Sequence, residues 1–149
     1  MQEYSHPEFN LSGYKISTTN KDKRSGSDIM SAWTKWREGN LADKVVGKSN
    51  ETLYCVYYNY QNAQNSDDRS YDMLIGFETD NGVMQLDPEI INVSIPAQNY
   101  KYDSVKREDF PAFIAKWTEI NSMSDLNRTF GCDMDIYSKD EITIAVAVI

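Results

Sequence analysis

Two stretches of the chain carry apolar residues at helical spacing. The first follows Asp28, a residue type that often caps a helix N-terminus, and ends at Gly39. Its apolar positions recur at i, i+3, i+4 and i+7, which places them on one face of a helix. These positions are Ile29, Ala32, Trp33 and Trp36. The pattern predicts an amphipathic helix with one buried face.

The second stretch repeats this arrangement. Asp109 stands in the capping position and Pro111 lies in the first turn, where proline is well tolerated. The apolar positions have the same spacing and are Phe110, Phe113, Ile114 and Trp117. Aligning the two caps also aligns Lys35-Trp36 with Lys116-Trp117, which indicates an internal repeat.

Strand-like runs flank both helices in the same order. One run precedes each helix and two follow it, each rich in Tyr, Val, Ile and Phe. The runs are residues 11–19, 52–60 and 71–77 in the first half, and 100–105, 130–137 and 141–149 in the second. Polar loops at 61–70 and 138–140 fit hairpin connections. Residues 79–96 connect the halves, and 91–95 within them form a candidate short strand.

The repeated order predicts an α+β fold built from tandem β-α-β-β repeats. We expect a single domain of residues 1–149, with halves at approximately 9–79 and 90–149. One such unit cannot cover its own sheet. Two units related by a pseudo-twofold axis share an antiparallel sheet and bury both main helices. A groove at their junction is a natural place for a small ligand.

The charge balance narrows the class of partner. The 149 residues include 23 acidic and 15 basic side chains, a formal net charge of −8, which disfavours binding to a phosphate backbone. No apolar run approaches the roughly 20 residues that span a bilayer, and the N-terminus lacks a secretory pattern. Cys55 and Cys132 lie in strand-like runs and are expected to be buried thiols. We expect a cytoplasmic protein without direct nucleic-acid or membrane contact.

Residues 130–137 carry a candidate binding chemistry. With a period of two, Asp133, Asp135 and Tyr137 share one strand face. The apolar residues Cys132, Met134 and Ile136 take the other face and are expected to lie under the helix. An exposed, solvated strand face is the alternative explanation for the two aspartates. A carboxylate among aromatic walls instead favours an organic cation, through charge attraction and cation–π contact. Asp135, in the middle of the run, is the stronger candidate.

Aromatic residues form 12% of the chain, enough to line such a site. Besides Asp135, the predicted ligand-binding residues are Trp33, Trp36, Tyr58, Tyr60, Tyr71, Phe77, Tyr100 and Tyr137. Core packing is the competing explanation for the tryptophans. Strand alternation allows only one of Tyr57 and Tyr58 to face a given side, and both sides remain open as the position of the groove.

The sequence offers little support for catalysis. Its only histidine, His6, lies beside Pro7 near the N-terminus, which disfavours a histidine-based triad or metal cluster. No G-x-S-x-G, P-loop or G-x-G-x-x-G motif occurs. Asp133 and Asp135 share one face and are poorly placed to flank a substrate. We therefore assign no catalytic residue, metal or cofactor.

Five segments carry a family resemblance when their order and spacing are taken together. They are 54–60 (YCVYYNY), 71–78 (YDMLIGFE), 93–100 (VSIPAQNY), 116–120 (KWTEI) and 128–137 (RTFGCDMDIY). From about residue 9 to the C-terminus, the chain resembles the GyrI-like, AraC-type effector-binding domain. Stand-alone members of that family, including integron gene-cassette products, have about this size.

The resemblance implies the duplicated fold and a groove that binds amphipathic, often cationic compounds. Many members carry a glutamate at the base of the pocket, in a pattern like Asp-Phe-Glu-x-Tyr. Residues 133–137 place Asp135 in this acidic position, with a shorter side chain. Regulators of the family add a helix-turn-helix module, for which this chain has no room. Regulation of transcription would then require a separate transcription regulator as partner.

Three functions are open at this point. We predict a stand-alone binding domain for small amphipathic or cationic molecules, which acts as a sensor, a sequestering protein or a drug binder. Rhodamine- and tetraphenylphosphonium-type dyes are suitable test ligands. The resemblance to relatives that hydrolyse electrophilic small molecules gives a second possibility, in which Asp135 activates water. A third is a protein-binding inhibitor module, as in the gyrase-inhibitor relatives.

Overall fold

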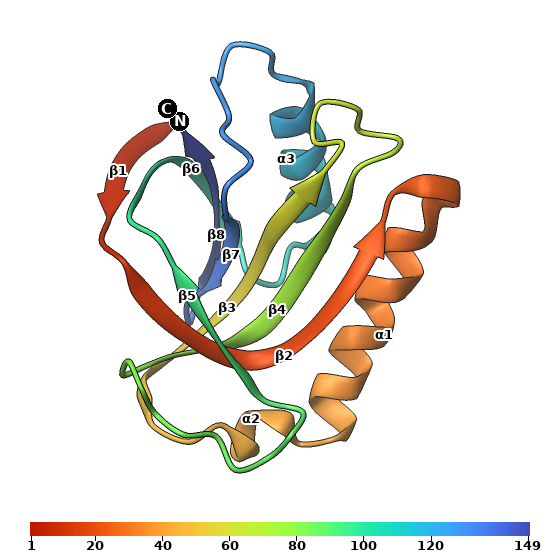
Figure 1. Ribbon diagram of the computed structural model, residues 1–149. Coiled ribbons are helices and arrows are strands. Elements are labelled where there is room, and N and C mark those ends of the chain that lie inside the picture. The colour runs from red at the N-terminus through yellow and green to blue at the C-terminus, as the bar shows by residue number, and fades with distance from the viewer.

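A computed structural model describes residues 1–149 as one eight-stranded antiparallel sheet with two main helices (Figure 1). The elements are β1 (Gln2–His6), β2 (Phe9–Thr19), the 3-10 helix η1 (Lys21–Lys23), α1 (Arg24–Glu38), α2 (Leu41–Lys44), β3 (Lys48–Gln61), β4 (Ser70–Thr79), β5 (Ile91–Ile95), β6 (Gln98–Lys106), α3 (Phe110–Ser122), β7 (Asp133–Tyr137) and β8 (Glu141–Val148). The predicted α+β fold with two β-α-β-β repeats is confirmed.

The order of strands in the sheet is symmetric. It runs β1-β6-β8-β7-β3-β4-β2-β5, so that β7-β8-β6 of the second half mirrors β3-β4-β2 of the first. The outer strands are exchanged: β1 precedes the first repeat but pairs with β6, and β5 precedes the second repeat but pairs with β2. The pseudo-twofold axis passes between β3 and β7, where Cys55 lies opposite Asp135.

The sheet curls, and close approach of two backbones allows it to do so. Gly13 of β2 and Gly76 of β4 are paired, and a Cβ atom on Gly13 would lie 1.9 Å from the carbonyl oxygen of Ile75. Only glycine tolerates this approach. The bend in β2 is visible in Figure 1.

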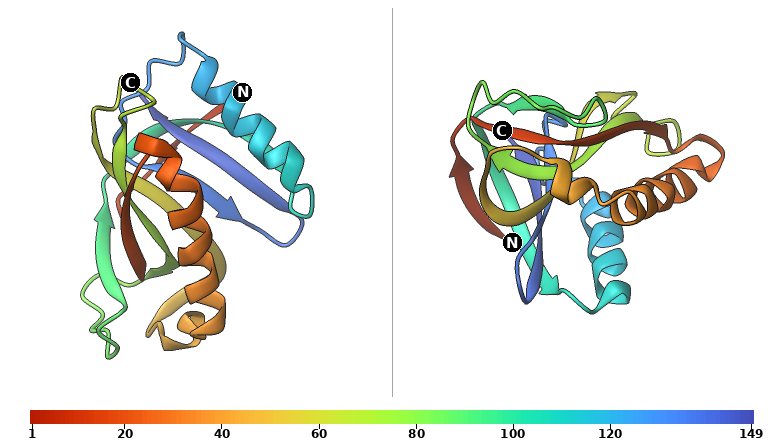
Figure 2. Two further views of the ribbon diagram at one scale, coloured as in Figure 1. Left: turned by 90° about the vertical axis from the view of Figure 1, so that its right-hand side faces the viewer. Right: turned by 90° about the horizontal axis from the view of Figure 1, so that it is seen from below.

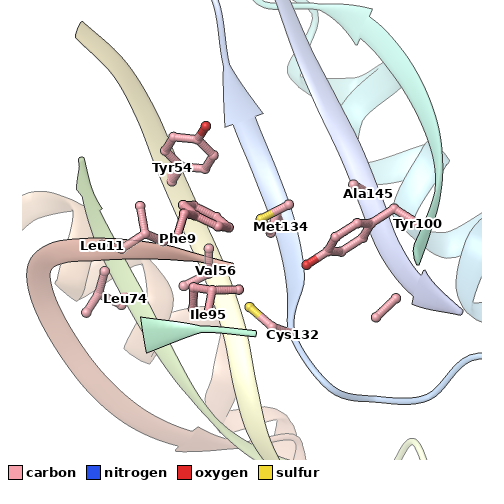
Figure 3. Close-up of a cluster of buried hydrophobic side chains, with 11 residues drawn as sticks. Phe9, Leu11, Tyr54, Val56, Leu74, Ile95, Tyr100, Cys132, Met134 and Ala145 are labelled. Atoms are coloured by element: carbon pink, nitrogen blue, oxygen red, sulfur yellow. The ribbon is translucent and has the colours of Figure 1, made fainter. Parts of the chain in front are cut away.

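The inside of the curl holds a cluster of buried apolar side chains from both halves (Figure 3). It comprises Phe9, Leu11, Tyr54, Val56, Leu74, Ile95, Tyr100, Cys132, Met134, Ala145 and Ala147. Cys132 and Met134 therefore point away from the helices, contrary to our expectation that they lie under one. Asp133 and Asp135, which alternate with them, take the helix-covered face.

Both helices lie on this other face of the sheet (Figure 2). They bury different numbers of apolar side chains. Ala32 and Trp36 of α1 are buried against the sheet together with Leu41 of α2. In α3 only Ile120 is buried, and Phe110 and Ile114 are 65% and 48% exposed. The second predicted apolar stripe is therefore only partly buried. No helix combines the length and the apolar character that a membrane crossing requires.

Several elements differ from the prediction at their ends, and one strand was not predicted. Helix α1 begins at Arg24, ahead of Asp28, whose carboxylate accepts a hydrogen bond from the Thr18 hydroxyl instead of capping the helix. Strand β1 was not predicted. Strand β7 begins at Asp133 because Phe130 adopts a left-handed conformation with φ of 53°. Helix α3 begins as predicted, with the Asp109 carboxylate accepting from the Ala112 amide.

Candidate functional site

Asp135 lies at the centre of the helix-covered face and has no exposed surface. Its side chain is held by two neutral donors. The Tyr57 hydroxyl donates to Oδ2 at 2.6 Å, and Nε1 of Trp117 donates to Oδ1 at 2.8 Å. Tyr57 comes from β3 of the first half and Trp117 from α3 of the second. The site is therefore assembled from both repeats and contains a carboxyl group without a cationic partner.

Burial decides the protonation of this group. Desolvation raises the pKa of Asp135 to about 7, and the charge of Asp133 acts in the same direction. The hydrogen bonds from Tyr57 and Trp117 favour the ionised form and oppose the increase. Burial also raises the pKa of the Cys55 thiol and the Tyr57 hydroxyl well above their ordinary values. Asp135 is thus a buried group whose charge changes near neutral pH.

Two tryptophan–tyrosine pairs surround the axis and are related by it. From the central pair Cys55–Asp135, two steps along each strand lead to Tyr57 and Tyr137. Trp117 of α3 packs edge-on against Tyr57 at 5.8 Å between ring centroids, and Trp33 of α1 packs edge-on against Tyr137 at 5.4 Å. Each helix therefore extends a tryptophan onto the central strand of the other half.

This arrangement corrects the repeat alignment made from the sequence. Trp33, not Trp36, is the counterpart of Trp117, so the helices align about one turn away from the register of their caps. Trp36 is buried and packs on Phe77 at 5.9 Å in the core beneath α1. Core packing, the competing explanation for the tryptophans, therefore describes Trp36 fully and Trp33 in part, because Trp33 is partly buried and packs against the same cluster.

A bulge in β3 extends the aromatic surface. Strict alternation would put Tyr60 on the same face as Tyr58, but the strand register shifts between Tyr58 and Gln61, and Asn59 has φ of 53°. The irregularity turns Tyr60 toward the helix-covered face. There its ring lies 5.6 Å from that of Tyr71, which in turn lies 6.0 Å from that of Tyr57.

The structure thus divides the predicted ligand-binding residues into three groups. Trp33, Tyr60, Tyr71 and Tyr137 lie on the face of Asp135, in two separate sets of ring contacts: Tyr60 and Tyr71 connect to Tyr57, and Trp33 contacts Tyr137 in the paired half. Trp36 and Phe77 belong to the core beneath α1. Tyr58 and Tyr100 pack with the cluster inside the curl, on the opposite side of the sheet. They are not brought together with Asp135.

Sequence reasoning missed the two residues that contact Asp135. The repeat signal already paired Trp117 with a tryptophan of the first helix, but gave no reason to place it over the acid. Tyr57 was the other member of an ambiguous alternating pair. Assigning Cys55 to the helix-covered face would have selected it, because residues two apart on a strand share a face.

Asp133 has the same exposure as Asp135 but different partners. Its Oδ2 accepts from Nη2 of Arg128 and from the Tyr60 hydroxyl, both at 2.7 Å, and its Oδ1 accepts from the Ala147 amide at 2.9 Å. Both oxygens are satisfied by an ion pair and two further donors. Asp133 therefore acts as a structural link between β7, β8 and the adjoining loop.

The expected hollow with a carboxylate at its base is closed over that carboxylate. Asp135 has no exposed surface, and Tyr57 and Trp117 each donate a hydrogen bond to one of its oxygens. Two other surface hollows, one along the outer side of α1 around Thr34 and one near Asn10 at the end of β2, have a single apolar lining residue each. Neither has the aromatic walls that an amphipathic ligand needs. The aromatic surface around Asp135 is the candidate site.

Comparison with known proteins identifies the family. Residues 4–148 match the family described as Cass2, integron-associated effector binding protein, and this chain belongs to that family. The sequence-based resemblance to effector-binding domains is thereby confirmed. No curated protein matches the sequence.

Solved structures with the same fold cover almost the whole chain. An integron cassette protein from the mobile metagenome of Vibrio cholerae has a TM-score of 0.77 at 21% identity, over 99% of this chain and 95% of that one. SAV2435, in a structure with bound tetraphenylphosphonium, has a TM-score of 0.75 at 14% identity, over 99% and 93%. A putative transcription regulation protein from Staphylococcus aureus MU50 has a TM-score of 0.69 at 11% identity, over 98% and 97%.

Proposed function

We propose that this protein binds amphipathic organic cations at Asp135 and acts as a sensor or sequestering module for them. One observation carries the proposal: a fully buried carboxyl group, held only by neutral donors, lies at the centre of an aromatic surface. A cation near Asp135 would stabilise its ionised form in a poorly hydrated environment, where charge attraction is strong. The similar fold of SAV2435, seen with a lipophilic cation, supports the same ligand class here.

The two tryptophan–tyrosine pairs suggest how a ligand enters. Trp117 and Tyr57 are tied to Asp135, whereas the half-buried Trp33 and Tyr137 contact each other without a hydrogen bond to Asp135. A planar or propeller-shaped cation would first pack on Trp33 and Tyr137. Displacement of the Trp117 or Tyr57 ring would then expose the carboxylate. The rings supply apolar and cation–π contacts, and Asp135 supplies the charge.

A matched pair of ions tests the proposal directly. Tetraphenylphosphonium and tetraphenylborate have nearly the same shape and opposite charge. At pH 8, where Asp135 is ionised, we expect the wild type to prefer the cation and Asp135→Asn to lose at least about tenfold in cation affinity, or about 1.4 kcal/mol. Binding is measured by isothermal titration calorimetry and by the rise in Tm, since a ligand specific for the folded state stabilises it.

Asp125→Asn is the matched control, because Asp125 is exposed and undergoes the same chemical change. It should leave both affinities unchanged. Cation affinity of the wild type should also rise with pH up to about 7 and then level off, following ionisation of Asp135. Equal affinity of the two ions, or an equal loss for both in Asp135→Asn, would remove charge recognition at Asp135 from the proposal.

A further inference from the structure

Two arginines lie at the end of the aromatic surface, and both are almost completely buried. Arg69 has 9% of its surface exposed, and the side chain of Arg128 has 8% exposed. Their guanidinium carbons lie 4.8 Å and 4.4 Å from the centroid of the Phe130 ring. The two positive charges therefore share one aromatic ring in a protein whose net charge is −8.

Arg69 and Arg128 have more N–H donors than the protein supplies hydrogen-bond acceptors for. Nη1 and Nη2 of Arg128 donate to Asn121 and Asp133, but its Nε is buried without a partner. Arg69 donates through Nε to the Ala63 carbonyl at 2.9 Å, and its Nη atoms make no hydrogen bond to protein. A guanidinium has five N–H donors, so most of those on Arg69 are free.

The charges do not balance either. Asp133 is the one carboxylate that forms a salt bridge with this pair, and its oxygens already accept three hydrogen bonds. Burial and the charge of Arg128 lower the pKa of the Arg69 guanidinium, as expected for two cations sharing a poorly hydrated region. Buried charges in proteins are normally paired. A second anion would complete the charge balance and the hydrogen bonds together.

The arginines are continuous with the site at Asp135. A chain of ring contacts leads from Tyr57 through Tyr71 and Tyr60 to Phe130, with a centroid distance of 5.4 Å in the last step. Asp133, which binds Arg128, is two residues from Asp135 on the same strand face, a span of about 6.6 Å. A ligand of two or three rings covers that distance.

We propose that Arg69 and Arg128 form a carboxylate-binding subsite, and that the ligands of this protein therefore include aromatic compounds with both a cationic group and a carboxylate. The cation lies toward Asp135, the rings pack on the aromatic surface, and the carboxylate receives hydrogen bonds from the free donors of the arginine pair. The planar fork of a guanidinium matches a carboxylate in this way. The inference rests on the proposed cation site and specifies its ligand class.

Two dyes that differ in one group provide the probe. Rhodamine 110 carries a free carboxylate, and rhodamine 123 is its methyl ester, with the same cationic ring system. We expect the wild type to bind rhodamine 110 about tenfold or more tightly than rhodamine 123 at pH 8, measured by fluorescence anisotropy. This comparison needs no variant. Equal binding, or preference for the ester, would overturn the inference.

Substitutions test whether the arginine pair causes the preference for rhodamine 110 over rhodamine 123. Arg69→Gln should reduce rhodamine 110 binding to the level of rhodamine 123 and leave the latter within about twofold. Arg37→Gln removes an exposed arginine on α1 and is the matched control, in which the preference persists. Because Arg69 also holds the loop through Ala63, the circular dichroism spectrum and Tm of each variant are compared with the wild type. A preference that survives in folded Arg69→Gln contradicts the assignment.

The same measurements separate this inference from the proposed function. If Asp135→Asn weakens rhodamine 123 while the wild type does not distinguish the two dyes, the cation site stands and the carboxylate subsite fails. Benzoate added alone tests whether the arginine pair binds a carboxylate that is not attached to a cationic ring system. A rise in Tm with benzoate, without any preference for rhodamine 110, would mean that the arginines bind a separate small anion, and would overturn the subsite.

Discussion

Asp133 and Asp135 lie two residues apart on one strand face and are equally buried, but their hydrogen-bond and charge partners differ. Asp133 is paired with Arg128 and receives two further hydrogen bonds. Asp135 receives two hydrogen bonds from neutral side chains and has a pKa raised to about 7. We call Asp133 with Arg128 and Tyr60 the ionic region, and Asp135 with Tyr57 and Trp117 the neutral region. The ionic region links strands and a loop. The neutral region contains a carboxyl group whose charge depends on its surroundings.

The difference shows how a duplicated fold acquires one site. Around the pseudo-twofold axis, the backbone and the tryptophan–tyrosine pairs are repeated, but the central residues are a thiol, Cys55, and a carboxyl group, Asp135. Of the two, the carboxyl group accepts hydrogen bonds from Tyr57 and Trp117. A symmetric scaffold therefore presents an asymmetric surface, in which one aromatic pair is hydrogen-bonded to the acid and the other is not.

The largest effect should come from breaking the ionic region. Asp133→Asn leaves Arg128 buried without its anion, and removal of one partner of a buried pair typically costs about 3–5 kcal/mol. We expect a loss of this size in urea unfolding at pH 7.5. Asp133 would not act as a structural link if the variant lost less than about 1 kcal/mol.

The neutral region should show a pH-dependent stability. Between about pH 4 and pH 7 the unfolded chain ionises Asp135 while the folded protein keeps it protonated, so stability falls as pH rises. The contribution is roughly 1.4 kcal/mol per pH unit and levels off above pH 7. Asp135→Asn lacks it. The stability difference between variant and wild type should therefore grow in favour of the variant from pH 5 to pH 7.

Urea unfolding of both proteins across this range measures that difference. Any change in hydrogen bonding introduced by the asparagine shifts the difference by a constant amount and leaves its slope intact. Asp125→Asn, at an exposed aspartate, is the matched control variant. A difference independent of pH would mean that Asp135 is already ionised at pH 5 in the folded protein.

The smallest effect should distinguish the two tryptophans. Trp117→Phe leaves an oxygen of the buried Asp135 without its donor, which should cost about 1–3 kcal/mol and raise the pKa of Asp135 further. Trp33→Phe removes an indole that makes no hydrogen bond to Asp135 and should cost less than about 1 kcal/mol. Equal losses at pH 8 would indicate that packing, rather than the carboxyl group, distinguishes the pairs.

Much of the fold was predictable because its signals are local. Helix periodicity, the Asp109 cap and the polar hairpin loops act over a few residues, and their repetition revealed the two halves. Strand β1 was missed because Gln2–His6 carries no alternating apolar pattern, and its place is decided by pairing with β6. Tyr60 was selected although its orientation depends on the bulge at Asn59. Tyr58 and Tyr100 were selected by residue type, and their strand faces point into the curl.

The amino-acid sequence alone determined the duplicated architecture and drew attention to Asp135, because periodicity and residue chemistry are written in consecutive positions. The tertiary structure decided which face of β7 the aspartates occupy, because β7 pairs between β3 and β8 with Met134 directed into the cluster inside the curl. It also decided that Tyr57 and Trp117 meet at Asp135, and that Arg69 and Arg128 share Phe130. These contacts join residues far apart in the chain, and strand order and helix position bring them together.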